Sequence, residues 1–253
     1  MLKKKKQGDY FRKRWNAVLF HLETFRAYGD TEALHRVRVE IKKMKAVLLL
    51  DEKQFKEKKF QHHFKRINEL FKQAGKVRTA QVNLELIEKY EIVNEQTEKE
   101  QTEIMVRESE KLFSNLNHYL KFFKDKPTFF LHHFSKMEDR KIKHKVKGQL
   151  AQLNKTFHHR IPAEELHESR KILKRLIYVH DIFPTDLMNE LNLRMEYLKR
   201  VEELIGKWHD TIIAIELVGK DKKLVHKIHS AGKKQLKTIH AQTQNFKQKS
   251  SNH

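Results

Sequence analysis

The chain contains no cysteine, so disulfide bonds, thiolate metal ligands and thiol nucleophiles are excluded. It has only three prolines and seven glycines, and it lacks β-branched alternating runs, so little interrupts a helical pattern. No apolar run approaches the roughly 20 residues that a membrane-spanning helix needs. The lysine-rich beginning leads into charged sequence, so we expect no signal peptide. These absences together predict a soluble cytoplasmic protein.

Acidic residues are also few relative to basic ones. The 253 residues include 54 Lys+Arg and 33 Asp+Glu, which gives a formal charge of +21 with histidine neutral. A hydrophobic fraction of 38% still provides enough apolar material for a core. This charge predicts a polyanionic partner but reports only its sign, so DNA, RNA, anionic lipid, inorganic polyphosphate and acidic proteins all stay open.

Apolar residues recur at three- and four-residue spacing almost throughout, which predicts an all-α protein. Gly29 and Asp30 predict the end of one helix and the N-cap of the next. We expect residues 1–8 and 247–253 to be frayed. The expected helices cover about 9–28, 31–50, 55–74, 76–90, 94–123 and 127–160, others begin near 163, 185 and 207, and the last covers about 221–246.

The chain contains an internal repeat. Residues 34–45 recur as 166–177, and residues 67–79 have their counterpart at 201–210. Both pairs of segments are separated by nearly the same number of residues, so we predict a duplicated unit of about half the chain length. The sequence therefore predicts a single domain over 9–246, made of an N-terminal half (9–126) and a C-terminal half (127–246).

In each copy, a basic stripe lies beside the apolar stripe of one helix. The apolar stripes are predicted to face the core, and they consist of Leu34, Val37, Ile41, Met44 and Leu48 in the first copy and Leu166, Ser169, Leu173 and Leu176 in the second. The basic stripes consist of His35, Arg38, Lys42 and Lys45 in the first copy and His167, Arg170 and Lys174 in the second. Lys171 and Tyr178 lie close to the second stripe, with Arg175 at its margin.

Cations one helical turn apart repel each other, so such a stripe costs free energy unless an anion meets it. Arg can bind phosphates bidentately, whereas Lys binds as a point charge. A solvated basic face is the alternative for a single stripe, but two stripes in the same frame favour a binding role. We expect the aromatic residues at helical spacing, Phe71 and Trp208 included, to be core residues.

Gly75 and Gly206 are expected to be helix C-terminal glycines that allow a tight turn. Lys76 and Lys207 would then open the next helices, whose backbone N–H groups could bind an anion with Arg78 and His209 beside them. A plain turn with solvated charges is the alternative reading of these segments.

No motif for catalysis or cofactor binding is present, so we expect a protein that is not an enzyme and has no cofactor. The chain has no P-loop, no Glu-x-Glu-x-Lys signature and no His-Glu-x-x-His helix. Adjacent histidines on a helix point about 100° apart and chelate one ion poorly; such pairs are His62-His63, His132-His133 and His158-His159. His226 and His229 have a chelating spacing, but no nearby carboxylate completes a site, so we expect no metal.

The repeated segments resemble the CHAD family, the conserved histidine α-helical domain. Its hallmark is a His-x-x-Arg-x-x-x-(Arg/Lys)-(Arg/Lys) helix in each half. The chain matches it with His35, Arg38, Lys42 and Lys43 in the first half and with His167, Arg170, Lys174 and Arg175 in the second. The family's Leu-Gly-x-x-(Arg/His)-Asp segment is matched by residues 205–210, while Thr79 stands in place of the Asp in the first half.

The resemblance implies two four-helix-type bundles with pseudo-twofold symmetry and a basic cavity between them. Family members bind inorganic polyphosphate, and many occur near polyphosphate granules or fused to triphosphate-tunnel enzymes. The resemblance thus implies non-catalytic binding of polyphosphate or a similar linear polyanion, with no membrane partner. The implied ligand contacts are His35, Arg38, Lys42, Lys43, Lys45, His167, Arg170, Lys171, Lys174, Arg175 and Tyr178, with Arg78 and His209 as further candidates.

Two other functions stay open. A sequence-nonspecific nucleic-acid-binding protein could use the same charge, although the sequence contains no helix-turn-helix or RNA-recognition motif. A scaffold could dock acidic proteins on the long charged helix predicted over 94–123, although its mixed charges favour a solvated or self-pairing surface. If His35 or His167 binds polyphosphate as a cation, affinity would rise as the pH falls through about 6.5.

Overall fold

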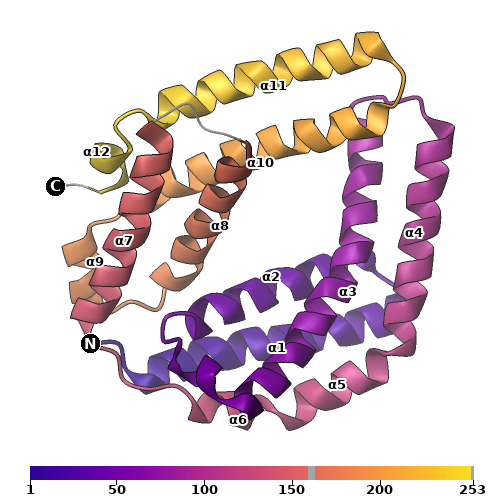
Figure 1. The fold of residues 1–253 in the computed structure, drawn as a ribbon. Coiled ribbons are helices and arrows are strands. Elements are labelled where there is room, and N and C mark those ends of the chain that lie inside the picture. Colours follow the sequence, from indigo (N-terminus) through magenta and orange to yellow (C-terminus); the bar gives the residue numbers. More distant parts are fainter. Residues whose placement is uncertain (159–162, 252–253) are drawn as a thin grey trace. The chain divides into compact units, whose positions relative to one another are not determined.

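The computed structural model describes residues 1–158 and 163–251, which form helices joined by turns (Figure 1). These residues contain two isolated β-bridges but no β-strand, which confirms the predicted all-α fold. No helix in this part of the chain has the length and apolarity that crossing a bilayer requires. Two compact units are formed: an N-terminal unit of Lys3–Glu88 and Glu95–Lys136, and a C-terminal unit of Met1–Leu2, Lys89–Asn94 and the chain from Met137 onward.

In the N-terminal unit, α1 packs along α2 and also contacts α5 and α6 (Figure 1). The core of this unit therefore lies around α1. Its helices are α1 (Lys4–Tyr28), α2 (Thr31–Leu48), the 3₁₀ helix η1 (Lys53–Lys56), α3 (Lys58–Lys89), α4 (Glu95–Ser114), α5 (Leu116–Asp125) and α6 (Pro127–His132).

The connection between α1 and α2 has the predicted caps. Gly29 has φ +64°, a left-handed conformation, and its N–H donates to the Phe25 carbonyl at 2.9 Å. The Asp30 side chain accepts a hydrogen bond from the Glu32 N–H at 2.9 Å. These two caps end α1 and start α2, and they set where the basic stripe of α2 begins.

An aromatic cluster forms the centre of the N-terminal unit. Trp15 on α1 is fully buried, with ring centroids 4.5 Å from Phe123, 5.3 Å from Phe130 and 5.6 Å from Phe11. Its indole Nε1–H donates to the Phe123 carbonyl oxygen at 2.7 Å. Trp15 therefore joins α1 to both α5 and α6 through packing and one buried hydrogen bond.

In the C-terminal unit, α10 contacts both α8 and α11, while α7 contacts α8 and α12 (Figure 1). The Asp221 carboxylate caps α11 by accepting from the N–H groups of Lys223 and Leu224 at 2.9 and 3.0 Å. The helices of this unit are α7 (Asp139–His158), α8 (Ala163–His180), α9 (Thr185–Leu191), α10 (Met195–Val218), α11 (Lys222–Thr243) and α12 (Phe246–Ser250).

The two predicted apolar stripes, one on α2 and one on α8, are confirmed as core faces. Every member of both stripes is at most 2% exposed. The helices that carry the basic stripes are therefore held in one orientation within each unit by their buried neighbours. The internal duplication stays a prediction, as does the basic cavity between the halves.

Two of the long predicted helices are divided. Asn115 separates α4 from α5, and its side-chain amide donates to the Lys111 carbonyl at 2.9 Å, which competes with the backbone for that acceptor. The helix expected over 127–160 is two helices, α6 and α7, and its last two residues lie outside the described part of the chain. The N-terminal unit extends to Lys136, about ten residues past the division between halves predicted at 126–127.

The glycine turns were predicted wrongly. Gly75 lies inside α3 and Gly206 inside α10, and neither has a positive φ. The helices expected over 55–74 and 76–90 are therefore the single helix α3, and the helix expected from Lys207 begins at Met195. A glycine in a helix interior costs roughly 1 kcal/mol relative to alanine, so both positions need another physical reason.

The expected fraying of the ends was also wrong for the described residues. Leu2 is fully buried and exchanges two backbone hydrogen bonds of 3.0 Å with Met137. α1 begins at Lys4, and α12 covers Phe246–Ser250. Ser251 pairs with Leu193, while residues 252–253 lie outside the described part.

Trp15→Ala is expected to lower the free energy of unfolding by about 3–5 kcal/mol, because it empties a fully buried site and leaves a carbonyl without its donor. Urea unfolding followed by far-UV circular dichroism measures the change. Phe20→Ala on the same helix is the matched control, since Phe20 is 65% exposed and its loss should stay within about 0.5 kcal/mol. Equal losses in the two variants would contradict the assignment of Trp15 to the core.

Candidate functional site

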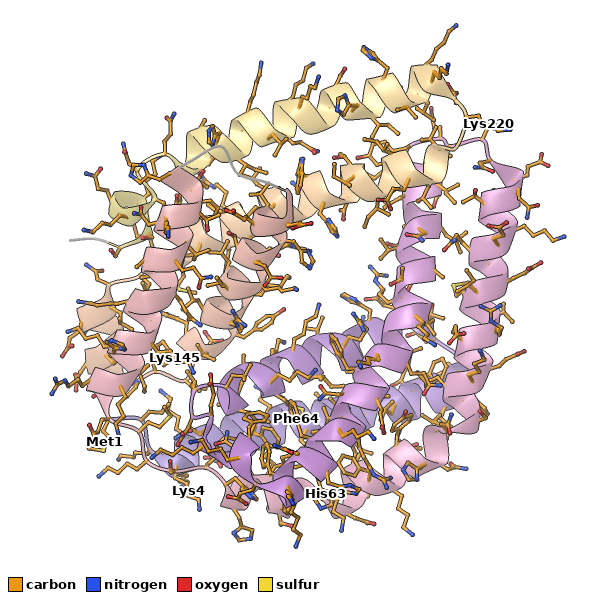
Figure 2. The ribbon with its side chains drawn as sticks, in the orientation of Figure 1. Met1, Lys4, His63, Phe64, Lys145 and Lys220 are labelled. Carbon is orange, nitrogen blue, oxygen red and sulfur yellow. The ribbon has the colours of Figure 1, made fainter. Side chains whose placement is uncertain are left out.

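Three cations of α2 surround one aromatic ring of α3. The Arg38 guanidinium carbon lies 4.1 Å from the Phe71 ring centroid, and the amines of Lys45 and Lys42 lie 4.2 and 6.0 Å from it. Phe64, labelled in Figure 2, has its ring 5.7 Å from the Lys45 amine. These are cation–π distances, and they hold the cations of α2 against α3. We call Arg38, Lys42, Lys45 and Phe71 the Phe71 cluster.

Gly75 explains how Arg38 reaches this position. The Arg38 guanidinium donates a hydrogen bond to the Phe71 carbonyl oxygen, one turn before Gly75 on α3. A Cβ atom on residue 75 would meet the same guanidinium inside van der Waals contact. The glycine therefore leaves room for a cation to lie directly on the helix backbone. This close approach, rather than a turn, explains why a glycine lies inside α3.

Two cations of the Phe71 cluster, Arg38 and Lys45, are not neutralised in the way that buried charges usually are. Burial, with the charges of Arg38 and Lys72 nearby, lowers the pKa of Lys45 to about 8. Burial and then the charge of Arg78 lower the pKa of Arg38. Among the described residues, neither Arg38 nor Lys45 forms an ion pair with a carboxylate. The charged forms are therefore destabilised, and an arriving anion would relieve that cost.

His35 and Arg78 lie next to this cluster. Burial lowers the pKa of His35, and the charge of Arg78 lowers it further. Arg78 already pairs with Glu85 at 2.9 Å and lies 3.7 Å from Glu32. The pH range for protonating His35 therefore lies below the value of about 6.5 expected from the sequence. The charge of Arg78 acts on both His35 and Arg38, but its guanidinium is already paired with carboxylates.

Two other basic residues of the first copy point elsewhere. The Lys43 amine lies 2.6 Å from Glu40, on a different side of α2 from Lys42. Lys76 pairs with Glu108 on α4 at 3.3 Å. Because α3 continues through Lys76, the helix N-terminus that was expected to bind an anion there does not exist. Lys43 was predicted as a ligand contact, and the structure does not bring it to the Phe71 cluster.

The C-terminal unit repeats the packing of an arginine on a helical glycine. A Cβ atom on Gly206 would lie 2.8 Å from Arg170 Nη2. Arg170 Nε donates to Glu202 Oε1 at 2.8 Å, and the Lys174 amine lies 3.0 Å from the same oxygen. We call Arg170, Lys174 and Glu202 the Glu202 cluster. In contrast to the Phe71 cluster, a carboxylate that is 12% exposed already occupies its centre.

The other predicted contacts of the second copy are spread along α8. The rings of His167 and His209 lie 5.2 Å apart, and burial, then Lys171 and His209, lower the pKa of His167. Lys171 pairs with Glu168 at 2.8 Å on an exposed face. The side chains of Arg175 and Tyr178 are half-buried. His209 lies within α10, so the helix N-terminus expected at Lys207 does not exist either.

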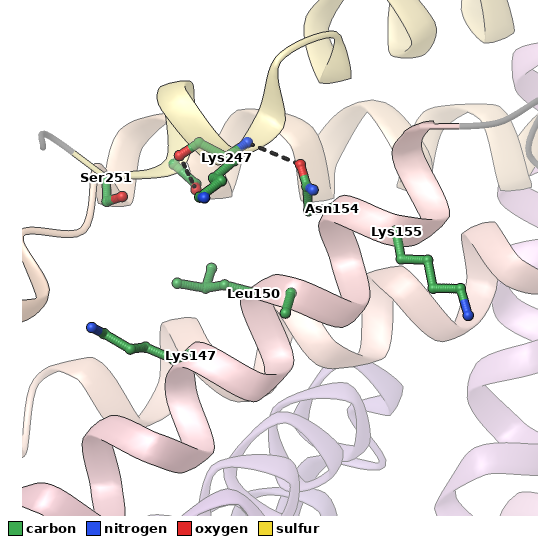
Figure 3. A pocket seen from close by; sticks show the side chains of 8 residues that line it. Lys147, Leu150, Asn154, Lys155, Lys247 and Ser251 are labelled. Atoms are coloured by element: carbon green, nitrogen blue, oxygen red, sulfur yellow. Dashed lines mark hydrogen bonds between the residues drawn. The ribbon is translucent and has the colours of Figure 1, made fainter.

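A separate cavity of about 360 Å³ lies in the C-terminal unit, lined by residues of α7 and α12 (Figure 3). Lys147, Lys155 and Lys247 line it, and the Lys247 N–H donates to Asn154 Oδ1 at 3.3 Å. In Figure 3 the side chains of Lys147 and Lys155 point away from each other, so they do not converge on one anion. None of the predicted ligand contacts lines this cavity.

The histidine pair His226 and His229 lines a cavity of about 500 Å³ with Gly219, Lys222 and Val225. Within 1–158 and 163–251, no group of three or more His, Cys, Asp or Glu side chains is placed to hold a metal ion. The cavity therefore offers two imidazoles beside a lysine, without a third ligand of the usual kind among the described residues.

Residues 9–219 match the family model of the CHAD domain. The chain belongs to the CHAD family. It is also similar in fold to the crystal structure of the CHAD domain from the plant Ricinus communis, with a TM-score of 0.60 and 13% sequence identity over 95% of this chain and 86% of that one. No match was found among curated proteins.

Sequence reasoning on this CHAD chain missed Phe71, Lys72 and Glu202. Phe71 was expected to be a core residue, but it is only half-buried and its ring contacts cations of α2. Trp208, by contrast, is buried as predicted. The available signal was position, since Phe71 and Glu202 each lie four residues before the helical glycine of their unit. Residues one turn apart share a helix face, so both were placed to meet the arginine.

Gly75→Ala is expected to displace the Arg38 guanidinium and weaken binding of inorganic polyphosphate, the ligand that the CHAD resemblance implies. Stability should change little or rise, because alanine favours the helix by about 1 kcal/mol and the displaced group is the end of a flexible side chain. Gly148→Ala is the matched control, since Gly148 lies inside α7 and a Cβ added there would meet nothing within 4 Å. Fluorescence-based binding and thermal melts measure the two effects, and equal polyphosphate affinity in both variants would contradict this role for Gly75.

The lowered pKa of Lys45 predicts that binding of polyphosphate by this CHAD protein depends on pH. A bound anion stabilises the charged amine, so its pKa rises above about 8 in the complex and the complex takes up a proton where the free amine is neutral. Affinity should therefore fall as the pH rises through about 8, by at most about 10-fold per pH unit. Lys45→Arg keeps the charge and should flatten this profile, whereas Lys45→Met should weaken binding below about pH 8 and should also flatten the profile. The same slope in wild type and Lys45→Arg would show that another group titrates.

Proposed function

We propose that this CHAD protein binds inorganic polyphosphate without catalysing its cleavage. The observation that carries the proposal is the Phe71 cluster, in which Arg38 and Lys45 are held half-buried, side by side, with no carboxylate partner among the described residues. A protein that keeps such cations charged gains free energy when an anion arrives. The two pKa values lowered by burial are the electrostatic sign of that unmet charge.

A linear phosphate polymer fits this geometry. Arg38, Lys42 and Lys45 follow one another at one-turn spacing on α2, so their charges can meet successive phosphates of one chain. The guanidinium binds a phosphate bidentately, and the amines act as point charges beside it. The charged ends of Arg38 and Lys45 lie against the face of the Phe71 ring, which holds them in place without neutralising them.

Binding rather than hydrolysis is proposed because of what surrounds the cations. Cleavage of phosphoanhydrides commonly relies on carboxylates that hold Mg²⁺. None of the four residues of the basic stripe of α2 is a carboxylate, and the central contact of its cations is an aromatic ring. The carboxylate of the Glu202 cluster is already engaged with Arg170 and Lys174. The CHAD resemblance further leads us to propose a cytoplasmic location near polyphosphate granules.

The proposal is tested by comparing long-chain polyphosphate with double-stranded DNA at one fixed salt concentration. Wild type is expected to prefer polyphosphate, because a half-buried cluster accepts a thin chain more readily than a duplex. Arg38→Glu combined with Arg170→Glu should lower polyphosphate affinity by about 10-fold or more, since each removes a charged hydrogen-bond donor and adds a repulsive charge. Affinity should also fall steeply with added salt.

The matched control is Arg12→Glu combined with Lys237→Glu. Both residues are exposed cations of α1 and α11 outside the two clusters, and the change in net charge is the same. A loss of the same size in this control would assign binding to overall charge alone. Equal affinity for DNA and polyphosphate would instead favour a sequence-nonspecific nucleic-acid-binding protein.

A further inference from the structure

The two clusters differ at one position on the helix that carries the glycine. Phe71 lies four residues before Gly75 on α3, and Glu202 lies four residues before Gly206 on α10. In both units an arginine packs on the glycine and contacts the residue at this position. The arginine therefore meets a neutral ring in the N-terminal unit and a carboxylate in the C-terminal unit.

A second difference follows along the basic stripes. Lys45 comes three residues after Lys42, whereas the residue three after Lys174 is the apolar Ile177. The Phe71 cluster thus contains three cations and a neutral ring. The Glu202 cluster contains two cations that share one carboxylate oxygen at 2.8 and 3.0 Å. Arg38 and Lys45 of the first cluster have no carboxylate partner among the described residues, whereas Glu202 balances one of the two positive charges in the second.

We infer that the Phe71 cluster is a self-sufficient site for a short oligophosphate, and that Glu202 is an internal anion that competes with ligand for Arg170 and Lys174. The inference rests on the proposed polyphosphate binding and deepens it by ranking the two clusters. It assigns Phe71 and Glu202 as the residues that set this rank.

The physical basis is the cost of displacing an existing partner. An anion that reaches Arg38 and Lys45 replaces no carboxylate, and it relieves charges that burial already destabilises. An anion that reaches Arg170 and Lys174 must approach a carboxylate that is only 12% exposed. Either the ligand stays next to a like charge, or Glu202 gives up two charged contacts.

Phe71 has a positive role in this comparison. Its ring attracts the cations through the negative face of the π-system, so it orders them without cancelling their charge. A carboxylate at the same place would order them equally well but would neutralise them, as Glu202 does for Arg170 and Lys174. The choice of residue at this one position therefore separates an open anion site from an occupied one.

The experiment measures the affinity of inorganic tripolyphosphate, a short probe, by calorimetry for three single variants. Phe71→Glu copies the residue of the other cluster and should lower affinity by about 10-fold or more, because an internal anion now competes with the probe. Phe71→Gln is its matched control of nearly equal size without the charge, and it should lose less. Glu202→Gln should increase the number of probe molecules bound or raise the overall affinity.

Paired neutralisations test the ranking directly. Arg38→Gln with Lys45→Gln should lower tripolyphosphate affinity by about 10-fold or more, and Arg170→Gln with Lys174→Gln should lower it clearly less. In the Glu202→Gln background the second pair should gain importance. Circular dichroism melts identify any variant that fails to fold, and the remaining variants of the set then decide the comparison.

The outcomes separate the two claims. Equal losses from the two pairs, or no effect of Glu202→Gln together with equal effects of Phe71→Glu and Phe71→Gln, would overturn the ranking while polyphosphate binding stands. Binding of long-chain polyphosphate without any binding of tripolyphosphate would also overturn it, because the Phe71 cluster would not be self-sufficient. Failure of wild type to bind long-chain polyphosphate would overturn the proposed function and this inference with it.

Discussion

The contact between the Arg38 guanidinium and the backbone of α3 at Gly75 is the interaction on which the candidate site depends. It brings a cation onto a helix surface that a side chain would otherwise cover, where the Phe71 carbonyl and ring hold it. Lys45 then lies against the same ring and shares its partly dehydrated surroundings. Replacing glycine by any larger residue would push this arrangement apart, although the helix itself would gain.

The Phe71 cluster lowers the stability of the unliganded protein in a way that a bound anion can reverse. Cations that are half-buried without counterions make the unliganded protein less stable than a neutral cluster of equal packing would. The aromatic core around Trp15 and the buried stripe of α2 supply the stability that tolerates this cost. A binding site of this kind takes its affinity partly from relief of the protein's own repulsion rather than only from new contacts.

Much of the fold could be predicted from the sequence, because apolar spacing and helix caps depend on residues close together in the chain. The spacing of apolar residues on α2 and α8 identified their buried faces, and Gly29 with Asp30 identified a helix junction. Gly75 and Gly206 could not be interpreted by the same rules, since their reason is an arginine from another helix. A glycine indicates that a side chain would not fit at its position, but it does not identify the group that occupies the space beside it.

The candidate site was predicted in part for the same reason. Arg38 and Lys45 were identified from their stripe, but Lys43 was included although its position one residue after Lys42 turns it toward Glu40. The contrast between Phe71 and Glu202 needed coordinates, because only contact distances show that both residues meet the arginine of their unit. Sequence spacing locates each helix and its buried face. Which residue of another helix a side chain contacts is set by the tertiary structure.

The backbone pairing of Leu2 with Met137 has a consequence for how the protein is made. Leu2 belongs to the C-terminal unit, yet the chain then passes through the whole of Lys3–Glu88 before it returns to that unit. A ribosome therefore finishes every helix of the N-terminal unit before Met137 exists to pair with Leu2. Folding during translation is thus expected to begin with the N-terminal unit, and in a nascent chain stopped before Met137 the apolar Leu2 would lack its backbone partner.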